Sequence, residues 1–151
     1  MSLIEITLID DIYKMWEKDS KVDELELDRE SLKIPQLHSK YIRLLTDESR
    51  QLKKMIETHK ILVRDKLEYY QGKMCEEDLE DRNWEPLDVR ILKSDIPKYI
   101  EGDIHVVKNL IQIADQREKV ELLRSILDCI MKRSYSIGHA IEWRKFLNGT
   151  S

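Results

Sequence analysis

Six basic side chains on one predicted helix could bind the phosphate backbone of a nucleic acid. At about 100° of rotation per residue they fall on one face or its flank, opposite the apolar side chains of the same segment. They are Arg43, Arg50, Lys53, Lys54, Lys60 and Arg64. Each phosphate that such a cation neutralises releases counterions, so the binding would be salt-dependent. Tyr69 follows this row, and aromatic rings beside cations suit stacking on the bases of a single strand.

A second interpretation explains the same row without a ligand. Glu57 and Glu68 interrupt it, so Lys53 and Lys60 could each pair with Glu57, and Arg64 with Glu68, along the helix. The solvent-facing side of a coiled-coil helix would have this pattern. The residues alone therefore leave open single-stranded DNA binding and a helical oligomerisation scaffold without affinity for DNA.

Sequence motifs of catalysis are missing. The four glycines are isolated, and no Cys-x-x-Cys or His-Glu-x-x-His pattern occurs. The one carboxylate cluster, at residues 76–81, lacks the ligand spacing of a calcium loop and is typical of a solvated acidic face. We therefore expect a protein that is not an enzyme and uses no cofactor or metal. A carboxylate-dependent metal site at residues 76–81 is the alternative.

Charge is distributed unevenly along the 151 residues. The net charge of −4 argues, for the chain as a whole, against a nucleic-acid partner. Residues 1–35 and 74–103 are acidic, with net charges of −5 and −6, whereas residues 36–73 and 104–151 carry +4 and +3. The objection therefore applies to the average and not to the basic segments.

Features of export are also missing from the sequence. No stretch is apolar enough for a secretory signal or a membrane span. Two cysteines, Cys75 and Cys129, are too few for a disulfide framework. We expect a cytoplasmic protein that does not interact with membranes.

A long helix must carry the row of cations. Residues 36–71 contain no proline or glycine, Pro35 stands where a first-turn proline is tolerated, and Gly72 follows as a C-terminal cap. We expect one helix of about 35 residues. Its apolar side chains recur at a spacing near 3.5, which favours packing against another long helix.

Shorter elements are predicted on both sides of this helix. Residues 3–18 have helical apolar spacing and end at Asp19. Residues 87–93 alternate partly, which suits a short strand or an extended arm.

Further helices are predicted after Asp103, which we expect to cap the first of them. This helix covers residues 104–132 and the last one residues 134–147, and the sequence leaves open whether a break separates them.

The fold class we expect is mainly α, with long amphipathic helices and a short extended or β element in the middle, assembling into an oligomer. Association is favoured because two long helices bury little surface in an 18.1 kDa monomer. A closed monomeric bundle is the alternative. The expected parts are an acidic arm with a short helix (1–33), a DNA-binding helix (34–73), an acidic connector (74–103) and a C-terminal oligomerisation part (104–151).

Four stretches of the sequence are informative when they are taken together: residues 34–41 (Ile-Pro-Gln-Leu-His-Ser-Lys-Tyr), 67–73 (Leu-Glu-Tyr-Tyr-Gln-Gly-Lys), 133–137 (Arg-Ser-Tyr-Ser-Ile) and 141–149 (Ile-Glu-Trp-Arg-Lys-Phe-Leu-Asn-Gly). They resemble the UvsY family of recombination mediators of T-even-like phages. The similarity extends over residues 39–149, and the Tyr-Tyr-x-Gly end of the charged helix is its most specific part.

The resemblance implies a homo-oligomeric protein that binds single-stranded DNA. It implies that the protein loads a UvsX-type recombinase onto DNA covered by the phage single-stranded DNA-binding protein, and contacts both proteins. It also implies a ring, which we expect to contain about six to seven subunits. The place of action would be the cytoplasm of the infected bacterial host.

The family's Lys-Ala-Arg-Leu motif, linked to DNA binding, falls on residues 64–67, which read Arg-Asp-Lys-Leu here. Lys and Arg are exchanged, and Asp65 replaces the alanine. The helical projection places Lys66 towards the apolar side, away from Arg64, so Arg64 is the firmer candidate. The DNA-binding candidates are Arg64, Lys66, Lys60, Lys53, Lys54, Arg50, Arg43 and Tyr69. The oligomerisation candidates are Leu123, Leu127, Ile130, Ile137, Ile141 and Phe146.

Overall fold

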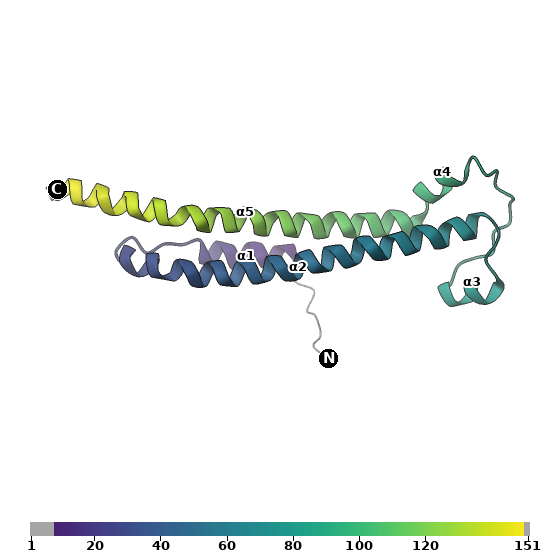
Figure 1. Ribbon diagram of the computed structural model, residues 1–151, viewed down its shortest axis with the longest axis horizontal. Coiled ribbons are helices and arrows are strands. Elements are labelled where there is room, and N and C mark those ends of the chain that lie inside the picture. Colours follow the sequence, from purple (N-terminus) through teal and green to yellow (C-terminus); the bar gives the residue numbers. More distant parts are fainter. Residues whose placement is uncertain (1–7, 150–151) are drawn as a thin grey trace. The chain divides into compact units, whose positions relative to one another are not determined.

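The computed structural model describes residues 8–149. Figure 1 follows its helices along the chain. They are α1 (Ile9–Asp19), α2 (Leu27–Tyr70), α3 (Glu76–Arg82), α4 (Ile96–Glu101) and α5 (Ile104–Leu147). Residues 8–149 contain no strand, so the mainly α prediction is confirmed and the short β element is not found. Residues 87–93, where the strand was expected, form irregular structure that ends in a turn. Residues 3–7 of the first predicted helix lie outside the described residues.

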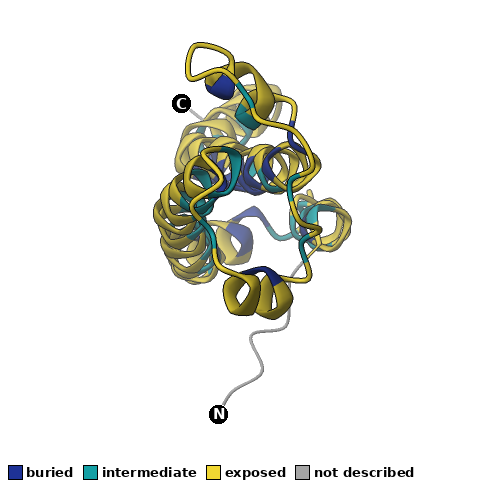
Figure 2. Ribbon diagram, turned by 90° about the vertical axis from the view of Figure 1, so that its right-hand side faces the viewer, coloured by how far each residue is buried: buried dark blue, intermediate teal, exposed yellow. Residues whose placement is uncertain are grey.

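Two compact units divide the chain. Unit 1 combines Met1–Arg50 with Arg117–Ser151, and unit 2 is Gln51–Gln116. Both long helices, α2 and α5, contribute residues to both units. Unit 1 therefore joins two segments that are distant in the sequence, whereas unit 2 is one continuous segment. Most residues of the helices are exposed or intermediate, as the yellow and teal parts of the ribbon in Figure 2 show.

Helix α2 is longer than predicted. It has 44 residues and starts at Leu27, so that Pro35 lies inside it. Proline has no N–H and removes one hydrogen bond of a helix, which is why the sequence pattern predicts a start there. Pro35 is exposed, so water can solvate the carbonyl that loses its partner. The buried Leu27 and the half-buried Ile34 hold the first turns of α2 within unit 1.

The other end of α2 agrees with its sequence signal. Gly72 has a positive φ of 73°, and its N–H donates to the Tyr69 carbonyl. The Lys73 N–H donates to the Glu68 carbonyl at 3.1 Å. This pair of bonds is the Schellman arrangement, which satisfies the last carbonyls of a helix.

Helix α5 is continuous over 44 residues, so residues 133–134 do not separate two helices. Its start is capped as predicted, because Asp103 Oδ1 accepts hydrogen bonds from the backbone N–H groups of His105 (2.9 Å) and Val106 (3.3 Å). Arg133 is buried and donates from Nη2 to the carbonyls of Asp19 and Ser20, both at 3.1 Å. The guanidinium therefore satisfies carbonyls at the end of α1.

The core of unit 1 joins α1, α2 and α5. Its buried members are Ile12, Tyr41, Leu123, Ile126, Leu127 and Ile130. The rings of Trp16 and Tyr41 meet edge to face, 5.6 Å apart. Tyr41 also donates its hydroxyl hydrogen to Asp19 Oδ2 at 2.9 Å. Burial and this carboxylate raise the pKa of Tyr41, so the phenol stays neutral and holds α2 to α1.

Candidate nucleic-acid interface

Four of the six cations of the predicted row lie on the part of α2 that belongs to unit 2. We call these four side chains the α2 basic face: Lys53, Lys54, Lys60 and Arg64. All four are exposed. The projection of the sequence onto a helix therefore placed them correctly towards solvent.

Carboxylates neutralise only part of the α2 basic face. Lys60 Nζ lies 2.9 Å from Glu57 Oε1, and Arg64 Nη2 lies 3.3 Å from Asp65 Oδ1. Within residues 8–149, Lys53 and Lys54 have no ion-pair partner, so the predicted Lys53–Glu57 pair does not form. Two lysines are therefore available to an external anion without first breaking an ion pair.

The two remaining cations of the row lie on the part of α2 in unit 1. Arg43 and Arg50 are exposed, and neither has an ion-pair or hydrogen-bond partner among the described side chains. They remain candidates for contacts with a polyanion.

Lys66, in contrast, is buried, with only 2% of its surface exposed. Its Nζ lies 3.0 Å from Asp103 Oδ2 and 2.9 Å from His105 Nδ1. The same ammonium stands 3.7 Å from the centre of the Trp84 ring, a cation–π contact. The structure thus places Lys66 inside unit 2, and this burial argues against a direct contact between its ammonium group and a phosphate.

Asp103 is the counter-charge of this buried cluster. Besides Lys66 it accepts a hydrogen bond of 2.6 Å from the Tyr70 hydroxyl. Burial alone would raise the pKa of Asp103, but the hydrogen bonds from Tyr70 and Lys66 outweigh it and hold the pKa below its ordinary value. The carboxylate is therefore ionised at neutral pH, and it ties the end of α2 to the start of α5 within unit 2.

Tyr69 is also held inside unit 2. Its hydroxyl donates to the Glu85 carbonyl at 2.7 Å. Its ring lies 5.0 Å from that of Tyr70 and 5.6 Å from that of Trp84, edge-on in both cases. Tyr69 is only half-buried, but its hydroxyl and two of its ring contacts are already used. Stacking on a base would compete with these contacts.

The sequence matches the model of one protein family over most of its length. The model described as recombination, repair and ssDNA binding protein UvsY matches residues 15–150. The chain belongs to the UvsY family. No curated protein sequence matches it significantly.

The fold agrees with this assignment to the UvsY family. Crystal structures of the recombination mediator protein UvsY from bacteriophage T4 in lattice types IV and II each have a TM-score of 0.80 and 20% identity to the chain. They cover 93% and 94% of this chain and 99% and 98% of the other. Lattice type I has a TM-score of 0.77 and 22% identity, covering 90% and 98%. At these identities the likeness shows the fold.

The UvsY motif position has an ion-pair arrangement that sequence reasoning missed. Asp65, which stands where the motif has alanine, lies 3.3 Å from Arg64 and, through Oδ2, 3.3 Å from Arg82 Nη2. Arg82 ends α3, and it adds a further cation beside Arg64. Arg64 lies on α2 and Arg82 on α3, so only the fold brings the two arginines to one carboxylate.

The oligomerisation candidates of this UvsY-family chain fall into two groups. Leu123, Leu127, Ile130 and Ile137 are buried within the chain itself, and the first three belong to the core of unit 1. Ile141 is half-buried, whereas Phe146 is 72% exposed and stacks on the exposed Trp143 at 5.5 Å. The four buried side chains contribute to the fold, whereas Phe146 is exposed on the chain.

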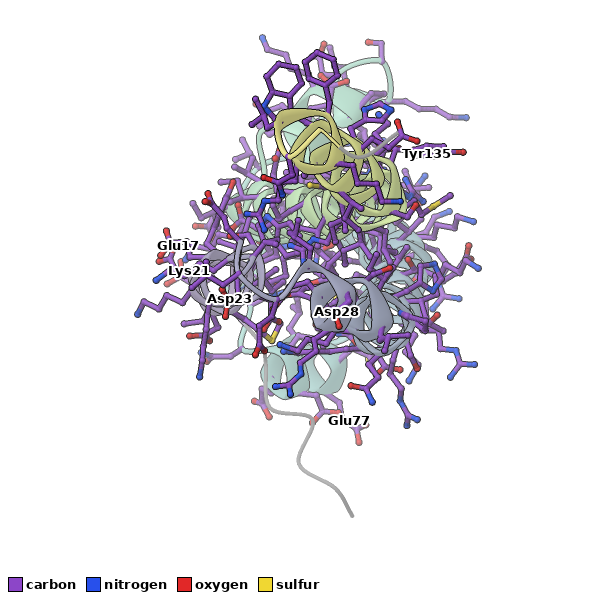
Figure 3. All side chains as sticks on the ribbon, turned by 90° about the vertical axis from the view of Figure 1, so that its left-hand side faces the viewer. Glu17, Lys21, Asp23, Asp28, Glu77 and Tyr135 are labelled. Carbon is purple, nitrogen blue, oxygen red and sulfur yellow. The ribbon has the colours of Figure 1, made fainter. Side chains whose placement is uncertain are left out.

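Side chains of the C-terminal half of α5 add to this exposed apolar surface. Tyr135 is 72% exposed, and Figure 3 shows it pointing outward. The exposed set on this part of α5 is Met131, Tyr135, Trp143, Phe146 and Leu147.

The acidic run does not gather into a metal site. Within residues 8–149, no group of three or more His, Cys, Asp or Glu side chains could hold a metal ion. The run forms the short helix α3, and its Glu77 points away from the ribbon in Figure 3.

Both cysteines are free and exposed. None of the helices described is both long and apolar enough to cross a membrane.

Proposed function

We propose that this protein is a recombination mediator that binds single-stranded DNA as a homo-oligomer. The observation that carries the proposal is the α2 basic face, four exposed cations of which two have no carboxylate partner among the described residues, on a chain of the UvsY family. Cations spaced along a helix contact phosphates without reading base edges, so the binding would have little sequence preference.

Oligomerisation would multiply this weak contact. Few cations per subunit give modest affinity, but a strand that contacts several subunits gains avidity from the repetition. The exposed and stacked rings of Trp143 and Phe146 support self-association, since adjoining exposed apolar side chains are typical of interaction sites. We propose a ring of about six to seven subunits, a closed arrangement in which every subunit uses the same interfaces.

The partners follow from the mediator role. A strand held on the oligomer would be presented to a UvsX-type recombinase on DNA that the phage single-stranded DNA-binding protein covers. We propose that the protein contacts both, in the cytoplasm of the infected host. The family assignment and the likeness to the T4 mediator support this role.

Fluorescence anisotropy of a labelled oligo-dT strand tests the proposal. We expect binding at low salt. The logarithm of the binding constant should fall linearly with the logarithm of the salt concentration, with a slope near −0.7 per phosphate contacted. Replacing Lys53, Lys54 and Arg64 by glutamine should weaken binding about 10- to 100-fold and make the slope shallower by roughly 2. Far-UV circular dichroism should remain unchanged, because all three side chains are exposed.

A matched control removes the same charge elsewhere in unit 2. Arg90, Lys93 and Lys98 are exposed and lie outside α2, so their replacement by glutamine should leave the affinity within about twofold. If the wild type did not bind at low salt, the proposal would be refuted and a structural scaffold without affinity for DNA would be favoured. Equal losses in both triple variants would mean that net charge alone governs binding and would refute an interface on α2.

Asp65 provides a test with the opposite sign. Asp65→Ala should strengthen oligonucleotide binding about two- to fivefold, because it frees Arg64 and Arg82 from their shared carboxylate. The control Glu80→Ala removes an exposed carboxylate of α3 that has no side-chain partner among the described residues. If the two variants bound equally tightly, the shared ion pair would not limit access to Arg64.

A further inference from the structure

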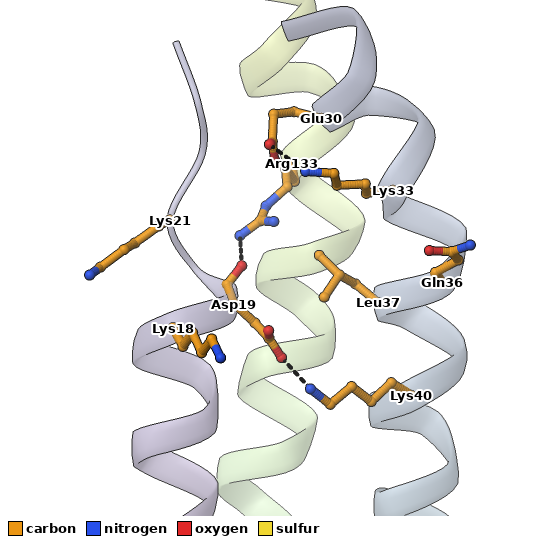
Figure 4. Close-up of a pocket in the computed structure, with 9 residues that line it drawn as sticks. All are labelled: Lys18, Asp19, Lys21, Glu30, Lys33, Gln36, Leu37, Lys40 and Arg133. Carbon is orange, nitrogen blue, oxygen red and sulfur yellow. Dashed lines mark hydrogen bonds and ion pairs between the residues drawn. The ribbon is translucent and has the colours of Figure 1, made fainter. Parts of the chain in front are cut away.

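A second positively charged site lies in unit 1. A cavity of about 360 Å³ opens where α1 ends beside α2 and α5. Figure 4 shows the side chains around it. Five of them are cationic and two are carboxylates, so the lining is positive overall. Its volume is in the range of small-ligand pockets, roughly 300–1,000 Å³.

Arg133 is the buried part of this pocket and is held in place. It is only 8% exposed, and its Nη2 donates to the carbonyls of Asp19 and Ser20. Its other guanidinium N–H groups have no partner among the described residues. No buried side-chain nitrogen in residues 8–149 lacks a hydrogen bond. The unused N–H groups of Arg133 are therefore open to solvent, oriented and ready to donate.

Lysines from two helices surround this guanidinium. Lys33 lies 3.0 Å from Glu30, and Lys40 lies 2.6 Å from Asp19. Lys18, at the end of α1, has no ion-pair partner within the described residues, although its charge helps to lower the pKa of Asp19. Lys21 also lines the cavity, but it points away from the other side chains in Figure 4. The two carboxylates thus neutralise two of the five cations.

We propose that this pocket binds a phosphate group. Its cations come from α1, α2 and α5, so a tetrahedral anion can contact more of them at once than a planar carboxylate can. A preoriented guanidinium fork with lysines beside it is the donor set that suits phosphate oxygens. The phosphate belongs either to a nucleic-acid backbone, which would add a contact to the proposed function, or to a free phosphate compound, which would act independently of it.

Thermal unfolding with pyrophosphate, at constant ionic strength, tests the site without DNA. Well above its dissociation constant, pyrophosphate should raise the midpoint of the wild type by roughly 2–4 °C. The double variant Lys18→Gln with Lys33→Gln should lose this rise. The matched control Lys14→Gln with Lys132→Gln, two exposed lysines of unit 1 that do not line the cavity, should keep it.

Arg133→Lys adds a variant that keeps the charge and removes the fork. It should also lose the pyrophosphate response, measured against its own midpoint without ligand, since Arg133 holds the end of α1 as well. No midpoint shift in the wild type, or equal shifts in the pocket and control variants, would overturn the proposal.

Binding of a labelled oligonucleotide then distinguishes the two sources of phosphate. Weaker binding by the pocket variant than by the control, by about 3- to 10-fold, assigns the phosphate to nucleic acid. Equal oligonucleotide binding, with the pyrophosphate response lost, assigns a free phosphate compound. The pyrophosphate measurement contains no DNA. If the wild type bound no oligonucleotide, the proposed function would be refuted, and the pyrophosphate measurement would still test this pocket.

Discussion

Lys66→Ala should lower the free energy of unfolding by about 3–5 kcal/mol, because it leaves a buried carboxylate without its cation. Asp103 would keep the hydrogen bond from Tyr70 and two backbone donors, but its ion pair and the contact between Lys66 and the Trp84 ring would be lost. Urea denaturation followed by tryptophan fluorescence measures the change. Lys60→Ala, which removes an exposed lysine from the same helix, should cost less than about 0.5 kcal/mol.

A double-mutant cycle separates the structural role of Lys66 from a role in DNA binding. Lys66→Met together with Asp103→Asn removes both charges, so the pair should cost less than the sum of the single changes. In conditions where the variants are folded, their oligonucleotide affinity should be close to that of wild type. A stable Lys66→Ala protein with lost DNA binding would contradict the buried position and indicate a direct phosphate contact.

Ile130→Ala should mainly lower the stability of the fold, whereas Phe146→Ala should mainly weaken assembly. Ile130 is fully buried in the core of unit 1, so its truncation should cost about 2–5 kcal/mol through lost burial and the cavity that remains. Phe146 is mostly exposed, so its truncation should change the stability of the subunit by less than about 0.5 kcal/mol. It should instead weaken self-association.

Two measurements at the same protein concentration distinguish these effects, since assembly itself contributes to apparent stability. Urea denaturation reports on the fold, and sedimentation velocity reports on the oligomer. Leu92→Ala, which truncates an exposed apolar side chain outside α5, is the matched control and should change neither. If Ile130→Ala dissociated the oligomer without loss of stability, that side chain would make an intersubunit contact. If Phe146→Ala left the oligomer intact, assembly would use another surface.

Helix positions were predictable where the signal is local. The proline- and glycine-free run predicts a long helix, Gly72 predicts its end and Asp103 the start of α5, because each of these residues acts on backbone groups within four positions of itself. The outward direction of Lys53, Lys54 and Arg64 also follows from helical rotation alone. The start of α2 was not predictable in this way, because packing within unit 1 extends the helix through Pro35.

The sequence by itself determined that the chain is helical, which cations face solvent and, through its resemblance, the family. Only the tertiary structure decided what the remaining charged residues do. Arg133 meets Asp19 across 114 positions of the chain, and Arg82 meets Asp65 across 17. Lys66 is buried against Asp103 by the return of α5 alongside α2 in unit 2. No local period relates such partners, and their contacts form only when burial of the apolar faces brings distant segments together.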